Sequence, residues 1–138
     1  MKDFTGCKIA LYYGNNLVVY LRDNKPGLNF AGMWDFPGGG REGEETPVEC
    51  IQRELSEEFS IHLNSDSILW TKEYPSMIDP NARAYFFVAK VDKPTVDAIS
   101  FGEEGQEWKL MDPNEFMAHE NAVPRLKARL ADYLATLS

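Results

Sequence analysis

The segment that follows Thr46 carries the signals of a helix with one packed face and one exposed face. Thr46 suits the N-cap, Pro47 suits the first helical position, and Glu49 completes a capping box with Thr46. Apolar side chains then recur at helical spacing, at Val48, Ile51, Leu55 and Phe59. We therefore predict a helix whose apolar stripe packs on a core and whose other face is available for binding.

Three glutamates lie off this apolar stripe, at Glu54, Glu57 and Glu58. Residues three and four apart are neighbours on a helix, so these carboxylates converge on one side, where like charges destabilise the helix unless something offsets them. Mg²⁺ and Mn²⁺ are suitable because both favour carboxylate oxygens. The alternative is a solvated acidic face, which is the usual role of a run of charges. The spacing, together with the family resemblance described next, favours the metal site.

The spacing around these glutamates resembles the Nudix (MutT-like) box. Gly39 is followed, after five residues, by Glu45. After seven more come residues 53–58, which read Arg-Glu-Leu-Ser-Glu-Glu, and then Ile61. One position differs, because the family usually has glycine where this chain has Ser60. Glycine suits a left-handed helix C-cap, and serine there costs about 1 kcal/mol.

Other segments extend the resemblance. Residues 34–39, Trp-Asp-Phe-Pro-Gly-Gly, resemble the strand that leads into the box. Glu104 resembles a carboxylate of a later loop in MutT-like proteins, and Asn121 resembles an asparagine that reads the purine edge in some oxidised-nucleotide hydrolases. The resemblance implies an α/β (α+β) fold, a Nudix-type α/β/α sandwich with a mixed central β-sheet. A length of 138 residues fits one such domain over residues 1–138.

Patterns outside the box fit a sheet that is covered on both faces. Residues 7–13 and 17–22 predict a hairpin, because both are rich in β-forming residues and a Gly-Asn-Asn turn separates them. Further strands are predicted at residues 68–74, 85–91 and 107–111, a short helix from residue 112, and an amphipathic helix over residues 124–137.

The resemblance also implies roles around the metal ion. Glu54, Glu57 and Glu58 are the expected metal ligands. Glu104 is expected as a further ligand or as the base, and Gly38 as part of the metal site. Glu54 is an alternative activator of the water, because the family varies in which glutamate does so. Hydrolysis of a phosphoanhydride needs charge neutralisation, an in-line water and a stabilised leaving phosphate, which such a cluster with Mg²⁺ supplies.

Four further residues are candidates for positioning and recognition. Arg53 is expected to orient Glu45 or a neighbouring ligand, and Gly39 to shape the loop before the helix. Arg22 is a candidate contact for substrate phosphates, and Phe36 for stacking on a base. Plainer roles stay open for both, because loop charges are often solvated and strand aromatics usually belong to the core.

The net charge of −8 limits the partners of the chain. Seven acidic residues and one basic residue lie between Glu42 and Glu58, so most of the excess is local. Such a chain repels nucleic-acid backbones, which argues against binding a duplex, and no apolar run is long enough to span a membrane. Cys7 and Cys50 form no C-x-x-C motif, so we expect buried thiols in a reducing compartment, the cytoplasm, rather than a zinc site.

The predicted function is Mg²⁺-dependent hydrolysis of a nucleoside triphosphate, including oxidised, 8-oxo-dGTP-like forms, to a nucleoside monophosphate and pyrophosphate. A nucleotide sugar, ADP-ribose or a dinucleoside polyphosphate is the alternative substrate within the same class. A nucleotide sensor without catalysis is disfavoured because all the box carboxylates are present. A merely structural acidic domain is a third alternative. The oligomeric state stays open between monomer and homodimer.

Overall fold

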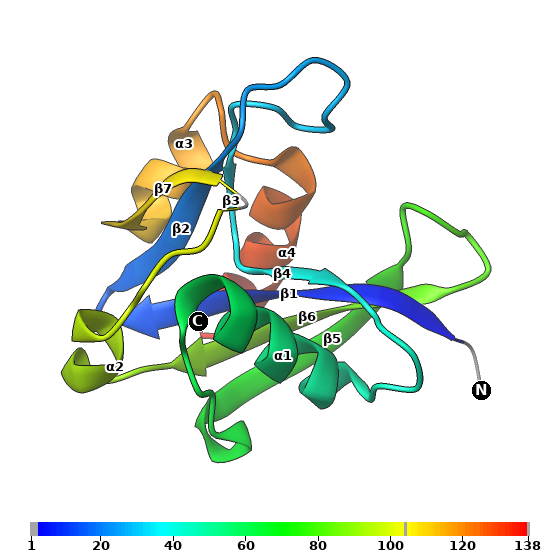
Figure 1. Cartoon of the computed structure of the whole chain (residues 1–138), viewed down its shortest axis with the longest axis horizontal. Coiled ribbons are helices and arrows are strands. Elements are labelled where there is room, and N and C mark those ends of the chain that lie inside the picture. Colours follow the sequence, from blue (N-terminus) through cyan, green and yellow to red (C-terminus); the bar gives the residue numbers. More distant parts are fainter. Residues whose placement is uncertain (1–2, 104, 138) are drawn as a thin grey trace.

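The chain folds into one mixed sheet with helices on both faces (Figure 1). The computed structural model describes residues 3–103 and 105–137. The strands are β1 (Phe4–Tyr13), β2 (Asn16–Arg22), β3 (Trp34–Asp35), β4 (Gly38–Gly40), β5 (Ile68–Pro75), β6 (Arg83–Lys90) and β7 (Gly105–Met111). The helices are α1 (Pro47–Phe59), α2 (Lys93–Asp97), α3 (Pro113–Ala118) and α4 (Pro124–Ala135), with a 3₁₀ turn, η1, at Ser65–Ser67.

The sheet is mixed because two strands far apart in the sequence run parallel at its centre. The main strand order is β3-β2-β1-β6-β5, with β4 paired to β1 and β7 paired to β2. Strand β1 runs parallel to β6, and the other pairs are antiparallel. The structure therefore confirms the predicted fold class.

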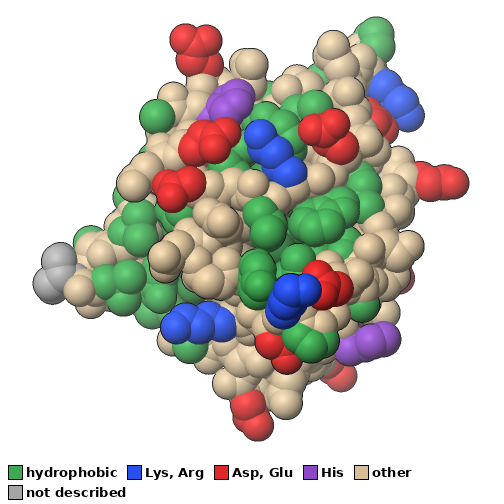
Figure 2. Space-filling view, turned by 90° about the vertical axis from the view of Figure 1, so that its left-hand side faces the viewer, with side chains coloured by type: hydrophobic (Ala, Val, Ile, Leu, Met, Phe, Trp, Pro, Cys, Tyr) green, Lys and Arg blue, Asp and Glu red, His purple; other side chains and the backbone are tan. Residues whose placement is uncertain are grey.

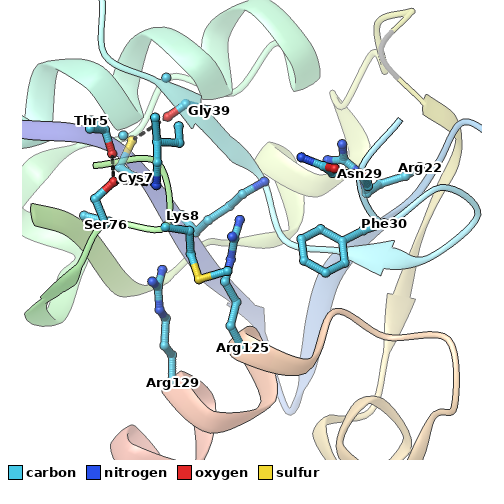
Figure 3. A pocket seen from close by; sticks show the side chains of 15 residues that line it. Thr5, Cys7, Lys8, Arg22, Asn29, Phe30, Gly39, Ser76, Arg125 and Arg129 are labelled. Atoms are coloured by element: carbon cyan, nitrogen blue, oxygen red, sulfur yellow. Dashed lines mark hydrogen bonds between the residues drawn. The ribbon is translucent and has the colours of Figure 1, made fainter. Parts of the chain in front are cut away.

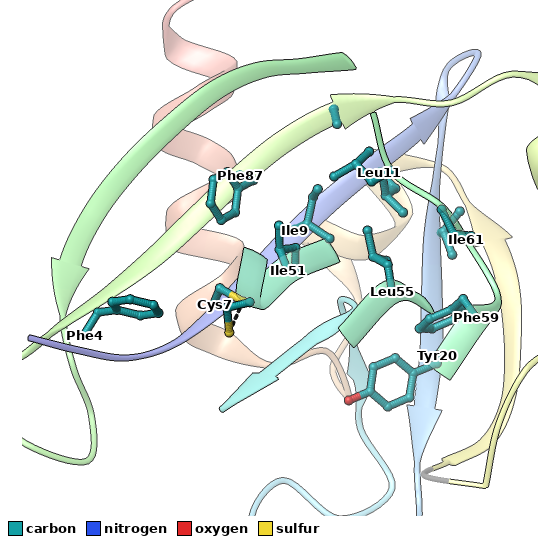
Figure 4. Packing of buried hydrophobic residues seen from close by; sticks show 14 residues of the cluster. Phe4, Cys7, Ile9, Leu11, Tyr20, Ile51, Leu55, Phe59, Ile61 and Phe87 are labelled. Atoms are coloured by element: carbon teal, nitrogen blue, oxygen red, sulfur yellow. Dashed lines mark hydrogen bonds between the residues drawn. The ribbon is translucent and has the colours of Figure 1, made fainter. Parts of the chain in front are cut away.

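Alternation along the strands sends side chains to two separate cores. On β1, Ile9 and Leu11 join a cluster under α1, whereas Ala10 joins a second cluster under α3 and α4. Figure 4 shows the first cluster, in which Ile51 and Leu55 of α1 face Ile9 and Leu11 of β1. A period of two along a strand produces this division, because successive side chains point to opposite faces. The result is an α/β/α sandwich.

The ends of α1 agree with the sequence signals. The Thr46 hydroxyl accepts a hydrogen bond from the Glu49 amide at 3.2 Å, and the Glu49 carboxylate accepts one from the Thr46 amide at 2.9 Å. Ser60 has φ 56° and ψ 34°, which is the left-handed conformation that glycine adopts without strain. The predicted capping box is confirmed, and Ser60 adopts the left-handed C-cap conformation in place of the usual glycine.

Most predicted elements are present with small shifts at their ends. The hairpin of β1 and β2 is confirmed, with Tyr12 opposite Leu17, and the last helix ends at Ala135. Helix α2 was not predicted, because five residues are too few to show apolar periodicity. Its sequence signal is local: the Asp92 side chain caps it by accepting from the Thr95 amide at 3.0 Å.

Cys7 and Cys50 are buried free thiols whose Sγ atoms lie 3.2 Å apart, as expected for packing residues.

The helices and the surface of the described residues give two further observations. In the described part of the chain, no helix combines the length and apolar character needed to cross a membrane. Figure 2 shows one face of the molecule, where acidic and basic side chains are interspersed around a hydrophobic area.

Candidate active site

Arg53 joins the loop after β4 to the acidic face of α1. Its Nε donates to Glu45 Oε2 at 2.7 Å, and its Nη2 donates to the main-chain oxygen of Gly40 at 2.7 Å. On the helix itself, Nη1 donates to Glu54 Oε1 at 3.0 Å and to Glu57 Oε2 at 3.2 Å. These bonds raise the pKa of Arg53, with Glu45 as the largest cause. Arg53 therefore fixes where these carboxylates lie.

Glu54 is held in a buried position against the main chain of β4. It is only 9% exposed. A Cβ atom added at Gly39 would lie 2.5 Å from Cδ of Glu54, so no side chain fits at position 39 while Glu54 occupies this site. The predicted role of Gly39 thus has a steric cause. Position 38 also requires glycine for steric reasons, because its φ of 145° and the nearby main chain of Cys7 exclude a side chain.

The other two glutamates lie further along the same helix. Glu57 is exposed, and Glu58 is half-buried. The amide of Gly102 donates to the main-chain oxygen of Glu58 at 2.8 Å, so the segment before β7 packs on the end of α1. A Cβ atom at Gly102 would lie 3.1 Å from Glu58 Oε2. The prediction for Glu104 falls outside the described residues.

A cavity of about 460 Å³ lies between β1, β4, α4 and the loops around them (Figure 3). Four cationic side chains line it: Lys8, Arg22, Arg125 and Arg129. Gly39 also lines it. Because Gly39 is in contact with the Glu54 carboxylate, the wall of the cavity adjoins the acidic face of α1.

Asp35 neutralises part of the positive charge in the cavity wall. Lys8 Nζ and Arg22 Nη1 each lie 2.9 Å from Asp35 Oδ2, and the Tyr20 hydroxyl lies 3.1 Å from the same oxygen. Burial alone would raise the pKa of Asp35, but the attraction and hydrogen bonds of Lys8 and Arg22 lower it below its usual value. Asp35 is therefore a buried, ionised anchor for both cations.

Comparison with known proteins identifies the family. A family model described as NUDIX domain matches residues 9–134, which is most of the chain. The chain belongs to the Nudix hydrolase family. The match begins at Ile9 on β1, one residue after Lys8, and it includes Arg129 on α4.

Individual relatives of this Nudix domain are more distant. An 8-oxo-dGTP diphosphatase of Haemophilus influenzae is 35% identical over 95 residues, covering 64% of this chain and 62% of the relative. An RNA pyrophosphohydrolase of Helicobacter pylori is 38% identical over 66 residues, covering 48% of this chain and 38% of the relative. The matches thus span less than two thirds of either relative. A MutT protein of Methanosarcina mazei shares the fold, with a TM-score of 0.78 at 18% identity over 99% of this chain and 97% of that one.

The donor set of this Nudix domain suits a hard divalent cation. Glu54, Glu57 and Glu58 offer carboxylate oxygens from one side of α1, which are the ligands that Mg²⁺ and Mn²⁺ favour. Among residues 3–103 and 105–137, no three acidic, histidine or cysteine side chains already stand together as a metal cage. Arg53 engages Glu54 and Glu57, so a cation held by these carboxylates would share their oxygens with the guanidinium group.

Two predicted substrate contacts fare differently from the glutamates. Phe36 is fully buried and stacks on Phe116 with ring centres 4.5 Å apart, so the prediction that it stacks on a base is wrong. Its ring points into the core beneath α3, on the face that packing requires. Asn121 is exposed and does not line the cavity, although its main-chain oxygen accepts from the Trp34 amide at 2.6 Å.

Sequence reasoning missed most of the cationic cavity of this Nudix domain. Arg22 was a candidate and does line the cavity, but Lys8, Arg125 and Arg129 were not considered. A lysine inside the apolar run of residues 7–13 was one usable signal. A second was the spacing of Arg125 and Arg129, which puts both on one side of a helix.

Proposed function

We propose that this Nudix domain is a Mg²⁺-dependent pyrophosphohydrolase that cleaves a nucleoside triphosphate to a nucleoside monophosphate and pyrophosphate. One observation carries the proposal: the acidic face of α1 and the cationic cavity meet at Gly39. A nucleotide has matching parts, since its polyphosphate requires metal at carboxylates and the rest of the molecule requires an adjacent cavity.

The proposed metal ligands are Glu54, Glu57 and Glu58, with Mg²⁺ as the ion and Mn²⁺ as a substitute. When bound, the ion neutralises phosphate charge and lowers the pKa of a bound water. Arg53 positions Glu54 and Glu57 through its Nη1 atom and thereby keeps the carboxylates on one side of the helix. Glu104 stays a prediction as further ligand or base.

The remaining candidates contribute recognition or backbone geometry. Arg22 is proposed to meet substrate phosphate from its place in the cavity wall, where Asp35 already orients it. Asn121 stays a prediction as a contact to the base, although it is not among the residues that line the cavity. Gly38 is proposed as part of the metal site because the chain there approaches β1 without a side chain.

A nucleoside triphosphate, including an oxidised one, is the first candidate substrate. The Haemophilus relative named 8-oxo-dGTP diphosphatase supports this choice. A nucleotide sugar, ADP-ribose or dinucleoside polyphosphate is the alternative. A sensor without catalysis fits less well because the box carboxylates remain. The charge of −8 supports a small nucleotide rather than a nucleic-acid duplex as ligand. The cytoplasm as compartment, and a monomer or homodimer as assembly, remain predictions.

Incubation of the purified protein with a substrate panel tests the proposal. The panel contains nucleoside triphosphates, their oxidised forms, nucleotide sugars, ADP-ribose and dinucleoside polyphosphates, each with Mg²⁺ and with EDTA, and products are separated by chromatography. We expect a nucleoside monophosphate and pyrophosphate from a triphosphate, and only with metal. Turnover that persists in EDTA, or no turnover of any panel member, would count against the proposed enzyme.

A further inference from the structure

Two arginines of α4 face the cavity from its side opposite Gly39. Arg125 and Arg129 are one helical turn apart, and Figure 3 shows both side chains rising from α4 toward the cavity, with Gly39 across from them. Arg129 is only 6% exposed. Two cations of one helix are thus set side by side in a partly buried place.

Neither arginine has the kind of partner that the other cavity cations have. Lys8 and Arg22 share Asp35. In residues 3–103 and 105–137, by contrast, no carboxylate forms an ion pair with Arg125 or Arg129. The Nε of Arg125 is buried without a hydrogen-bond partner in that same part of the chain.

Aromatic rings hold both guanidinium groups in place. The guanidinium carbon of Arg129 lies 4.6 Å from the centre of the Tyr74 ring, and that of Arg125 lies 5.3 Å from the centre of the Phe30 ring. A ring covers one face of a guanidinium, whereas the N–H donors lie in its plane. The donors therefore remain able to bind an acceptor with two oxygens.

Without a ligand, the pair of Arg125 and Arg129 destabilises the fold. A buried charge without a counter-charge destabilises a fold, and burial together with the nearby Arg125 lowers the pKa of Arg129. Arg125 also stands in the first turn of α4, where the helix dipole disfavours cations. Packing does not require this pair, since apolar residues could fill the same wall without the free-energy cost of burying charge. An anionic ligand offsets the cost.

Charge decides what kind of ligand fits. Among the described residues that line the cavity, four are cationic and none is acidic. Asp35 pairs with Lys8 and Arg22. The charges of Arg125 and Arg129 therefore remain without a counter-ion among these described residues, although the whole chain has a net charge of −8. A neutral nucleobase would take hydrogen bonds but would leave both arginine charges in place. A phosphate group accepts bonds from both guanidinium planes and neutralises them.

We propose that Arg125 and Arg129 bind a phosphate group of the substrate beyond the α-, β- and γ-phosphates of a simple nucleoside triphosphate. This inference rests on the proposed function and narrows its substrate class to nucleotides that carry such an additional phosphate. That phosphate belongs either to the sugar, as a 2′- or 3′-phosphate, or to the second nucleotide of a dinucleoside polyphosphate. The shared chemistry is a phosphate on the α4 side of the cavity.

Binding of inorganic phosphate to the metal-free protein tests the site without any turnover. Calorimetric titration in EDTA, at constant ionic strength, compares the wild type with Arg125→Gln, Arg129→Gln and the control Lys90→Gln, which removes an exposed positive charge elsewhere. We expect each arginine variant to bind phosphate about tenfold more weakly and the control to bind normally. Absence of phosphate binding in the wild type, or equal binding in all four proteins, would overturn the proposal.

A second variant separates recognition from folding. Arg129→Lys keeps the charge but loses the planar pair of donors, so its phosphate affinity should lie between those of the wild type and Arg129→Gln. Thermal unfolding should show that Arg129→Gln is at least as stable as the wild type, because a buried charge without a carboxylate partner is removed. If Arg129→Gln does not fold, the phosphate affinities of Arg125→Gln, whose half-buried side chain is the milder change, and of Arg129→Lys decide the matter. Wild-type affinity in both of these variants would overturn the proposal.

Hydrolysis with Mg²⁺ then identifies the source of the phosphate. The values of kcat/KM are compared for ATP, for ATP with a 3′-phosphate and for diadenosine tetraphosphate. We expect one of the two larger substrates to be preferred over ATP by at least about tenfold, and Arg129→Gln to abolish that preference. Equal use of all three substrates, or a preference that Arg129→Gln leaves intact, would contradict the proposal.

The phosphate titration and the hydrolysis assay can each contradict one proposal without contradicting the other. Phosphate binding that depends on the arginine pair, with no hydrolysis of any nucleotide, would support the anion site and reject the proposed enzyme. Metal-dependent hydrolysis of a simple triphosphate, with no arginine-dependent phosphate binding, would support the enzyme and reject the anion site.

Discussion

At the residue scale, Ser60 stores strain at the end of the glutamate-bearing helix. Its φ of 56° is unfavourable for a side chain with a Cβ atom. We expect Ser60→Gly to raise the free energy of unfolding by about 1 kcal/mol, measured by urea denaturation. Ser56→Gly is the matched control on the exposed side of α1 and should lower stability by about 0.5 kcal/mol. A stability loss in Ser60→Gly would contradict this account of the C-cap.

Asp35 is the residue whose ionisation matters most for the cavity wall. Replacement by Asn leaves Lys8 and Arg22 without a buried counter-charge and should cost about 3 kcal/mol in urea denaturation at pH 7. The exposed Glu120→Gln is a control that should change little. Equal stability of Asp35→Asn and wild type would show that the network contributes nothing.

The lowered pKa of Asp35 also fixes the direction of its pH dependence. Because the folded-state value lies below the unfolded value of about 3.9, the stabilisation is complete well above pH 4. It is lost as the pH falls through the folded-state pKa. Urea denaturation from pH 7 to pH 3 should therefore show the Asp35→Asn protein and the wild type converging only below about pH 4. Convergence at neutral pH would contradict this sign.

Local spacing made some site residues predictable and left others hidden. Glu54, Glu57 and Arg53 were readable because residues three and four apart on a helix must be neighbours. Arg129 was hidden because it becomes a cavity residue only when α4 packs behind β1. Phe36 was misjudged because it lies between β3 and β4, where no periodicity shows that its ring packs on Phe116 of α3.

At the element scale, α1 carries the proposed chemistry on one side and a core on the other. Glu57→Gln or Glu58→Gln should lower turnover by about 10²-fold or more with little loss of fold, since each removes a carboxylate from the metal side. The Glu44→Gln variant removes an exposed charge from the same acidic segment and should keep full turnover. Rates and circular dichroism are the measurements. Near-normal rates in both helix variants would remove these carboxylates from the metal site.

Elements were predictable in proportion to their periodicity. Strand β6 alternates Phe86 and Val88 on one face with Phe87 and Ala89 on the other, and its apolar run was recognised. Helix α2 and the two-residue strand β3 are too short to carry a period, so their positions depend on neighbours. The order of strands was not readable at all from periodicity, because the parallel pairing of β1 with β6 joins residues far apart in the sequence. Family resemblance supplied the α/β/α sandwich with a mixed sheet, but not the order of its strands.

At the scale of the whole molecule, charge is separated where the proposed reaction needs both signs. Acidic side chains gather on α1, and four cations gather in the cavity, although the chain carries an excess of eight negative charges. The thin wall at Gly39 brings the two regions into contact without a side chain between them. The sheet makes this possible, because β4 belongs to it and presents its main chain to both.

The same sheet separates two cores, and the separation has a thermodynamic consequence. Ile51 lies in the core under α1, whereas Leu130 lies in the core under α4, and both are fully buried. Ile51→Val should cost about 1 kcal/mol and Leu130→Ala about 3 kcal/mol in urea denaturation. Because the sheet lies between them and they share no partner, the double variant should lose the sum within about 0.5 kcal/mol.

A pair within one core provides the contrast. Ile51 and Leu55 are neighbours on α1 and fill the same cluster, so Ile51→Val combined with Leu55→Ala should deviate from the sum of the single losses by at least about 0.5 kcal/mol. Additivity across the sheet and coupling within one core would show that the sheet is a rigid divider between two packed layers. Coupling of Ile51 with Leu130 would instead show that strain passes through the sheet, and so through the strands that carry Lys8 and Gly39.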